Sequence, residues 1–154
     1  MMQKKVQIIS DGSLDLSQEL TKEKDIEVVP FYVSFDSETY QKEMVEVGVR
    51  EFYQEMVDHP TVFPKTSMPS VHDYYEVFEK HAKEKMPVIC ICITRKFSGS
   101  LQSATTAKDM ILEEYPDAQI TVIDSTVNTV LQGLYVLEAC RLRDMGLELS
   151  LIHI

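Results

Sequence analysis

Runs of apolar residues separated by polar turns divide this chain into short strands and amphipathic helices. An uninterrupted apolar run extends from Val88 to Ile93. Its length and its β-branched content predict a strand buried on both faces, as in a parallel sheet. Between Leu101 and Leu112 the apolar residues recur every three or four positions, which predicts one buried face of a helix. The hydroxyl-rich turn Ser98-Gly99-Ser100 joins this strand to this helix.

The same alternation of strands and helices is predicted along the rest of the chain. The predicted strand region 26–35 is interrupted by Pro30, which confines it to a sheet edge, a bulge or two short pieces because proline has no N–H to donate. Ser70 and Asp73 form a capping-box pattern at the start of one helix, and Gly146 fits the position just after the end of another. The predicted strands cover 6–10, 26–35, 88–93 and 120–123, and the predicted helices cover 16–20, 49–58, 71–82, 101–112 and 129–145. This order predicts an α/β fold in which helices flank a mostly parallel sheet.

Composition narrows the classes of function. The chain has 154 residues, enough for one domain with a sizeable core, and a formal net charge of −10. That charge argues against nucleic-acid binding and against a polybasic membrane anchor, both of which need clustered Lys and Arg. No apolar run approaches the roughly 20 residues that a membrane span needs. The polar start of the chain does not resemble a signal peptide, and two of the three cysteines fall in the predicted buried strand. We therefore expect a cytoplasmic protein.

Polar turns are predicted to gather at one edge of the sheet. In parallel sheets, ligands bind beyond the carboxyl ends of the strands. Three turns fall at such ends, namely 11–13, 98–100 and 124–126, and the loop 66–70 leads into a helix N-terminus. Backbone N–H groups at a helix start can hold an anion without any catalytic residue, so we expect a ligand head group at Ser98-Gly99-Ser100. The alternative is that these polar residues only cap helices. Asp11 and Asp124 are expected to accept hydrogen bonds from neighbouring N–H groups, because a carboxylate would repel a bound anion.

Five short motifs, taken together and in order, resemble the DegV family of bacterial fatty-acid-binding proteins. The resemblance extends over roughly Lys4 to Leu149. The motifs are Ser10-Asp11-Gly12-Ser13-Leu14-Asp15-Leu16, Val28-Val29-Pro30-Phe31, Thr66-Ser67-Met68-Pro69-Ser70, the segment from Ile93 to Ala104, and Val122-Ile123-Asp124-Ser125.

The resemblance implies a non-catalytic protein that encloses one long-chain fatty acid between two domains. In this chain the carboxylate would be held by Thr66 and Ser98, with Ser67, Gly99 and Ser100 in the same two loops. Some members hand their fatty acid to a separate kinase subunit, which converts it to an acyl phosphate. No cofactor and no metal are expected. The apolar residues Phe31, Val33 and Phe97 are candidates for lining the path of the tail, or else belong to an ordinary core.

The chain departs from the family pattern in its length. Family members are nearly twice as long, so residues 1–148 are expected to form the N-terminal domain of a protein whose second domain is missing. Residues 149–154 resemble the translation of a sequencing-adapter sequence, with no helix or strand of the family to continue. We expect them to be a tail that is foreign to the natural protein, and the alternative is an unusual natural terminus.

Three other kinds of chemistry have less support in the sequence than a carrier. A serine hydrolase using Ser98 would need a histidine base, yet Ser98 lacks the G-x-S-x-G context and His59, His72 and His81 fall in helices or at a helix end. The sequence contains neither G-x-G-x-x-G nor G-x-x-x-x-G-K-[ST], the two glycine-rich motifs that bind nucleotides. The pair Cys90 and Cys92 has no second Cys or His pair to complete a zinc site, which favours a core strand. The lipid carrier and the Ser98 hydrolase are the two hypotheses to separate.

Overall fold

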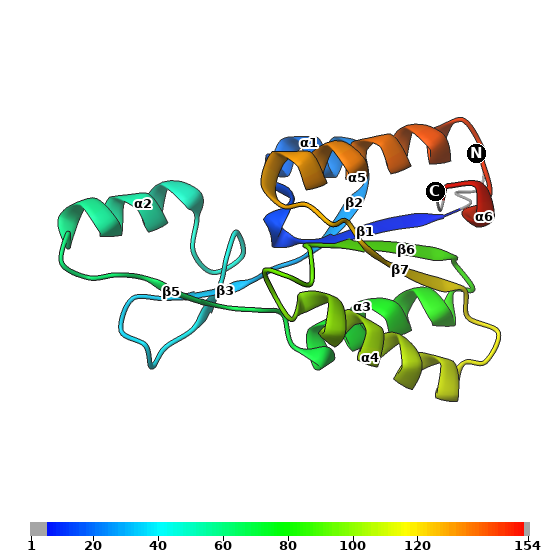
Figure 1. Cartoon of the computed structure of the whole chain (residues 1–154), viewed down its shortest axis with the longest axis horizontal. Helices are drawn as coiled ribbons and strands as arrows, with labels where there is room; N and C mark the ends of the chain where they lie inside the picture. The colour runs from blue at the N-terminus through cyan, green and yellow to red at the C-terminus, as the bar shows by residue number, and fades with distance from the viewer. Residues whose placement is uncertain (1–5, 153–154) are drawn as a thin grey trace.

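The computed structural model describes residues 6–152, which form a four-stranded parallel sheet with helices on both faces (Figure 1). The strand order is β2-β1-β6-β7, and every neighbouring pair is parallel. The strands are β1 (Gln7–Asp11), β2 (Ile26–Val29), β6 (Val88–Cys92) and β7 (Ile120–Asp124). The predicted fold class, an α/β fold with a mostly parallel sheet, is therefore confirmed.

Strand β6 lies in the middle of the sheet and is buried along its whole length, as its apolar sequence predicted. Cys90 and Cys92 project to the same face, with their Sγ atoms 3.7 Å apart. Burial of the Cys90 thiol raises its pKa well above the ordinary value, because a thiolate would be poorly solvated there. These cysteines are core residues.

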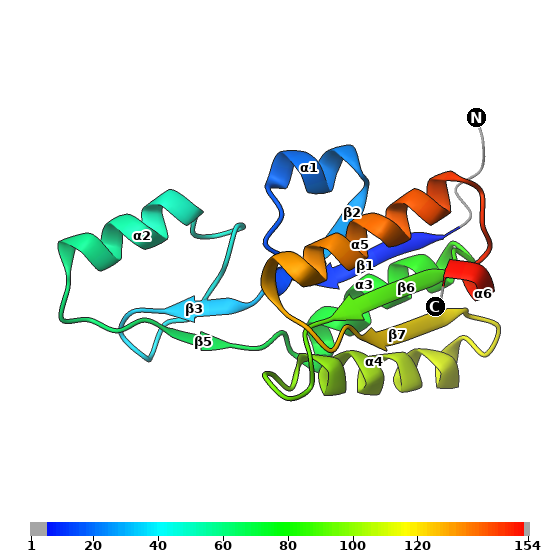
Figure 2. The same cartoon turned by 45° about the horizontal axis from the view of Figure 1, so that its top comes forward.

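Two layers of helices cover the sheet, and Figure 2 shows them on opposite sides. Helices α3 (Val71–Lys83) and α4 (Ser100–Glu114) cover one face. Helices α1 (Gln18–Glu23), α5 (Thr129–Asp144) and α6 (Leu149–Ile152) lie on the other face. The α3/α4 side buries Ile9, Tyr74, Phe78, Ala104, Ala107 and Ile111, and the α5 side buries Ile8, Ile89, Ile91, Val136 and Ala139.

Beyond Pro30 the chain leaves the parallel sheet and builds a second, smaller one. Strand β3 (Tyr32–Ser34) pairs antiparallel with β4 (Gln41–Lys42) and with β5 (Lys65–Ser67). This small sheet and helix α2 (Val49–Asp58) extend from the carboxyl ends of the parallel strands as an arm, at the left of Figure 1. The strand region at 26–35 is thus two pieces in two sheets. The expectation that residues 65–67 are loop was wrong, because pairing with a distant strand orders them.

Helix α2 has the predicted bounds, and its apolar stripe consists of Val49, Phe52, Tyr53, Met56 and Val57. No residue of α2 is buried, and Tyr53 and Val57 on its apolar stripe are 60% and 71% exposed. On this helix Phe52 contacts the ring of Phe35, with 5.2 Å between the centroids. Most of the apolar stripe of α2 therefore has no cover from the part of the chain that the structure describes.

The end of the described chain is more ordered than its sequence indicated. Residues Leu149–Ile152 form one turn of helix, although no continuation was expected there. Ile152 is buried beside β1, β6 and α5, because an apolar side chain that folds back after Gly146 can close that end of the core. Residues 153 and 154 lie outside the described range. That residues 149–154 are foreign to the natural protein stays a prediction.

We expect Gly133→Ala to lower the free energy of unfolding by about 1–2 kcal/mol, although alanine favours helix. A Cβ on Gly133, within α5, would lie 2.4 Å from the backbone oxygen of Leu14, so α5 would have to move. Urea denaturation measures the change, with Glu113→Ala on the exposed side of α4 as the control. An unchanged or increased stability would show that α5 does not approach Leu14 this closely.

Candidate functional site

The turn Ser98-Gly99-Ser100 lies between the carboxyl end of β6 and the start of α4, where the sequence predicted a head group. The Ser98 N–H donates to the Thr94 carbonyl at 3.3 Å, which closes the turn. The Ser98 Oγ accepts a hydrogen bond from the Ser100 N–H at 3.1 Å. Since this bond uses an oxygen lone pair, the hydroxyl hydrogen of Ser98 remains available to donate to a ligand.

The second predicted loop, residues 66–70, contacts this turn. A Cβ on Gly99 would lie 2.5 Å from the Sδ of Met68, so the Met68 side chain lies directly against the Gly99 backbone. Met68 is two residues from Thr66, and Gly99 directly follows Ser98. The structure thus brings together the two segments that carry Thr66 and Ser98. Within residues 6–152, the hydroxyls of Thr66 and Ser67 have no hydrogen-bond partner and both residues are exposed.

Behind the turn, the carboxylate of Asp11 is fully buried at the carboxyl end of β1. Its Oδ2 accepts from the Ile93 N–H at 2.9 Å and from the Ser100 hydroxyl at 2.8 Å. Its Oδ1 accepts from the Gln132 side-chain amide at 2.8 Å and from the Ser13 hydroxyl at 2.7 Å. Asp11 therefore accepts hydrogen bonds, as predicted. Its connection to Gln132 was missed, and the signal was a glutamine on the same face of α5 as Val136 and Ala139.

The small sheet is tied to helix α3 through Asp73. Its carboxylate accepts hydrogen bonds from the Tyr32 hydroxyl at 2.8 Å and from the Ser70 N–H at 2.8 Å, and it lies 2.9 Å from the Lys42 Nζ. The Ser70 hydroxyl in turn accepts from the Asp73 N–H, so the predicted capping box is present. Asp73 thus joins β3, β4 and α3 at one carboxylate and holds the arm against the main domain.

The structure places the remaining predicted site residues differently. Ser100 is fully buried, and its hydroxyl bonds to Asp11 and Tyr74. Val33 is 5% exposed and is paired directly with Thr66 across the small sheet. Phe31 is half-buried, and its N–H donates to Glu43. Phe97 is 75% exposed, so within the described chain it lines no enclosed path.

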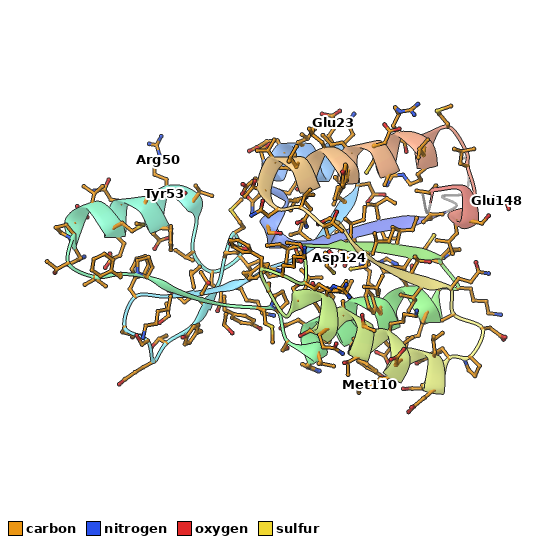
Figure 3. All side chains as sticks on the ribbon, viewed as in Figure 1. Glu23, Arg50, Tyr53, Met110, Asp124 and Glu148 are labelled. Atoms are coloured by element: carbon orange, nitrogen blue, oxygen red, sulfur yellow. The ribbon has the colours of Figure 1, made fainter. Side chains whose placement is uncertain are left out.

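Arg95 and Asp124 are charged residues near the Ser98-Gly99-Ser100 turn, and they lie close to each other. Arg95 lies 3.7 Å from the Oδ2 of Asp124, and its side chain is largely exposed. Asp124 is at the carboxyl end of β7, where Figure 3 labels it, and its Oδ1 accepts from the Thr126 N–H at 2.9 Å. This matches its predicted role as an acceptor for neighbouring N–H groups.

A hollow of about 530 Å³ lies at the opposite end of the sheet, beside the first residues of β1 and β2. It is lined by charged and polar groups that include Lys22, Glu27 and Lys80. His81 also lines it, with its Nε2 2.6 Å from the Oε2 of Glu27. This hollow contains none of the residues predicted to hold a ligand.

The histidines are engaged elsewhere. His59 and His72 lie 2.9 Å and 3.4 Å from glutamates on their own helices, and His81 contacts Glu27. Within residues 6–152, none of these three histidines is hydrogen-bonded to Ser98. Within residues 6–152 no group of three or more His, Cys, Asp or Glu side chains is placed to hold a metal. No helix in that range is long and apolar enough to cross a membrane.

These features define an α/β domain with a hydroxyl-bearing polar site at the carboxyl ends of its parallel strands. The family model described as "Uncharacterised protein, DegV family" matches residues 5–153. The chain belongs to the DegV family, which confirms the resemblance. A DegV domain-containing protein of Clostridium acetobutylicum is 35% identical over 142 residues, which cover 92% of this chain and 49% of the relative.

Solved structures give the same assignment. A stearic acid-binding protein of Eubacterium ventriosum is 46% identical, with a TM-score of 0.92 over 96% of this chain and 50% of the other. A DegV family protein of Thermus thermophilus, whose structure is described by its fatty acid binding, is 30% identical with a TM-score of 0.79 and similar coverage. The chain spans about half the length of the curated relatives that it matches.

We expect Asp73→Asn to destabilise the protein at about pH 7. Burial raises the pKa of Asp73, but hydrogen bonds from Ser70, Lys42 and Tyr32 outweigh it and lower the pKa to about 2 from 3.8. The folded state therefore binds this proton less readily than the unfolded chain, which contributes about 2 kcal/mol above about pH 4. That contribution is lost as the pH falls through about 2.

Urea denaturation of wild type and variant between about pH 7 and pH 2 measures this difference. The gap between the two proteins should narrow as the pH falls below about 4. Asp109→Asn, at an exposed position on α4, is the control. A gap that is absent at neutral pH, or that does not depend on pH, would contradict this role of Asp73.

Proposed function

We propose that this chain binds a long-chain fatty acid without catalysis, with the carboxylate held by Thr66 and Ser98. The observation that carries the proposal is the contact between Met68 and Gly99, which joins the two loops bearing these hydroxyls. The hydroxyl hydrogen of Ser98 is available, and the hydroxyl of Thr66 has no partner within residues 6–152. A hydroxyl donor on β5 and another on the turn that precedes α4 suit an anionic, two-oxygen head group.

The energetics of a fatty acid fit a site of this kind. Burial of one CH₂ group contributes about 0.8 kcal/mol, so a tail of about 16 carbons offers on the order of 12 kcal/mol before ordering costs. The head-group site then needs to orient and accommodate the carboxylate, and it does not need to supply most of the affinity. The stearic acid-binding protein of E. ventriosum, 46% identical to this chain, supports this choice of ligand class.

Exposed apolar surface supports the further proposal that residues 1–148 are the N-terminal domain of a two-domain protein. One such surface is the stripe on α2 that includes Tyr53 and Val57. Another is on the first half of α5 and consists of Val130, Leu131, Leu134 and Tyr135, each more than half exposed. Contiguous exposed apolar residues commonly mark interfaces. A second domain lying over these surfaces would enclose the tail beside the exposed ring of Phe97.

In this proposal the protein is a carrier, and a separate kinase subunit phosphorylates the carboxylate to an acyl phosphate. Thr66 and Ser67 lie on the exposed strand β5, so the head group would be held near the surface, where a partner can reach it. The expected compartment is the cytoplasm, where such a kinase has ATP. Acyl phosphate formed by the kinase only when this protein delivers the fatty acid would support this step.

We expect Thr66→Val and Ser98→Ala each to weaken stearate binding about tenfold, because each removes a hydrogen bond to a charged group. Binding of methyl stearate, which lacks the charge, should change less than stearate binding. Titration calorimetry or displacement of a fluorescent fatty acid measures both ligands, with Thr61→Val on an exposed turn as the control.

The same proteins test the hydrolase alternative. A carrier should show no turnover of p-nitrophenyl palmitate beyond the background rate. Turnover that is abolished by Ser98→Ala would contradict the proposal, as would stearate binding that is insensitive to both substitutions.

A further inference from the structure

The first turns of helices α3 and α4 are joined by one buried hydrogen bond. The Tyr74 hydroxyl and the Ser100 Oγ lie 2.6 Å apart, and both side chains are fully buried. Helix α3 begins four residues after Ser67, the last residue of the strand β5 that carries Thr66, and α4 begins two residues after Ser98. The Tyr74–Ser100 bond therefore connects the two segments that hold the proposed head-group hydroxyls.

The direction of this hydrogen-bond chain is set by Asp11. The Ser100 hydroxyl donates to the Oδ2 of Asp11 at 2.8 Å, because a carboxylate only accepts. The single hydroxyl hydrogen of Ser100 is then used, so Ser100 accepts from Tyr74. Ser100 has no hydrogen left to donate to a bound carboxylate, and its N–H is already bonded to the Ser98 Oγ.

Asp11 also holds the strand that leads into the turn. The Oδ2 atom that accepts from Ser100 accepts from the Ile93 N–H at 2.9 Å, and Ile93 directly follows β6. The Oδ1 atom accepts from Gln132 and Ser13, and these bonds connect the same carboxylate to α5 and to the turn after β1. The turn after β1, the residue after β6, and helices α4 and α5 thus bond to this carboxylate directly, and α3 is connected to it through Ser100.

We propose that Asp11 is the positioning residue of the fatty acid head-group site, acting through Ser100 and Tyr74 to fix the spacing between the Thr66 loop and the Ser98 turn. This inference rests on the proposed function. Ser100 then belongs to the support of the site, and Thr66 and Ser98 make the contacts with ligand. A shift of the α4 start would misplace the Ser98 hydroxyl without touching the path of the tail.

The experiment uses Ser100→Ala and Tyr74→Phe, each of which removes one link of the chain. Asp11 itself is left intact, since exchanging a carboxylate oxygen for NH₂ would disturb two of its accepted bonds together. Ser103→Ala is the matched control, because Ser103 is a buried serine on the next turn of α4 whose side chain makes no hydrogen bond within residues 6–152.

Affinities for stearate and for methyl stearate are measured for all four proteins. We expect Ser100→Ala and Tyr74→Phe to weaken stearate binding about five- to tenfold and methyl stearate binding less than about twofold, with Ser103→Ala changing neither. Hydrogen exchange of the Ile93 and Ser100 amides, measured without ligand, should become faster in Ser100→Ala and stay unchanged in Ser103→Ala.

Other outcomes distinguish failure of the positioning role from failure of the proposed function. If Ser98→Ala weakens stearate binding but Ser100→Ala and Tyr74→Phe do not, the positioning role of Asp11 is overturned and the proposed function stands. Equal losses for stearate and methyl stearate would mean that the network only stabilises the fold, which also overturns the positioning role. If stearate binding is absent, or unaffected by Thr66→Val and Ser98→Ala, the proposed function itself fails.

Discussion

A buried carboxylate is the constraint on which the carboxyl end of this sheet depends. The charge of Asp11 has no exposure to solvent, and a buried charge is costly unless several donors satisfy it. Donors from β6, α4, α5 and the turn after β1 supply those bonds. Once they are made, none of these elements can shift without leaving a buried donor or acceptor unpaired, so the polar site is held in place by its own support.

The arm is held in a different way from the main sheet. Its strands are short, α2 has no buried residue, and Asp73 supplies a principal polar attachment to α3. The Thr66 loop therefore belongs to the arm on one side and approaches the rigid Ser98 turn on the other. The Ser98 turn is thus firmly held and the segment that carries Thr66 is lightly held, so the segment can move relative to the turn at small cost.

The spacing of apolar residues and the position of proline predicted those helices and strands that depend mainly on local sequence. The apolar run at 88–93 and the helical spacing after it identified β6 and α4, and Pro30 marked where the chain changes sheet. Strand β5 was missed because it is only Lys65–Ser67 and is ordered by distant pairing with β3. The apolar spacing in α2 predicted an apolar face on this helix, but it could not predict which part of the protein covers that face. The motifs identified the two segments of the candidate site, whose role stays a prediction, whereas Gln132 was missed because a helical glutamine is usually a surface residue.

The sequence separation within the Asp11 network has a consequence for biosynthesis. The carboxylate meets Ile93 and Ser100, which follow it by 82 and 89 positions, and Gln132, which follows by 121. On the ribosome, Asp11 must therefore stay hydrated until most of this chain has emerged, and β1 cannot gain its β6 neighbour earlier. The polar network at the carboxyl ends of the strands is therefore among the last parts of this chain that can form during synthesis.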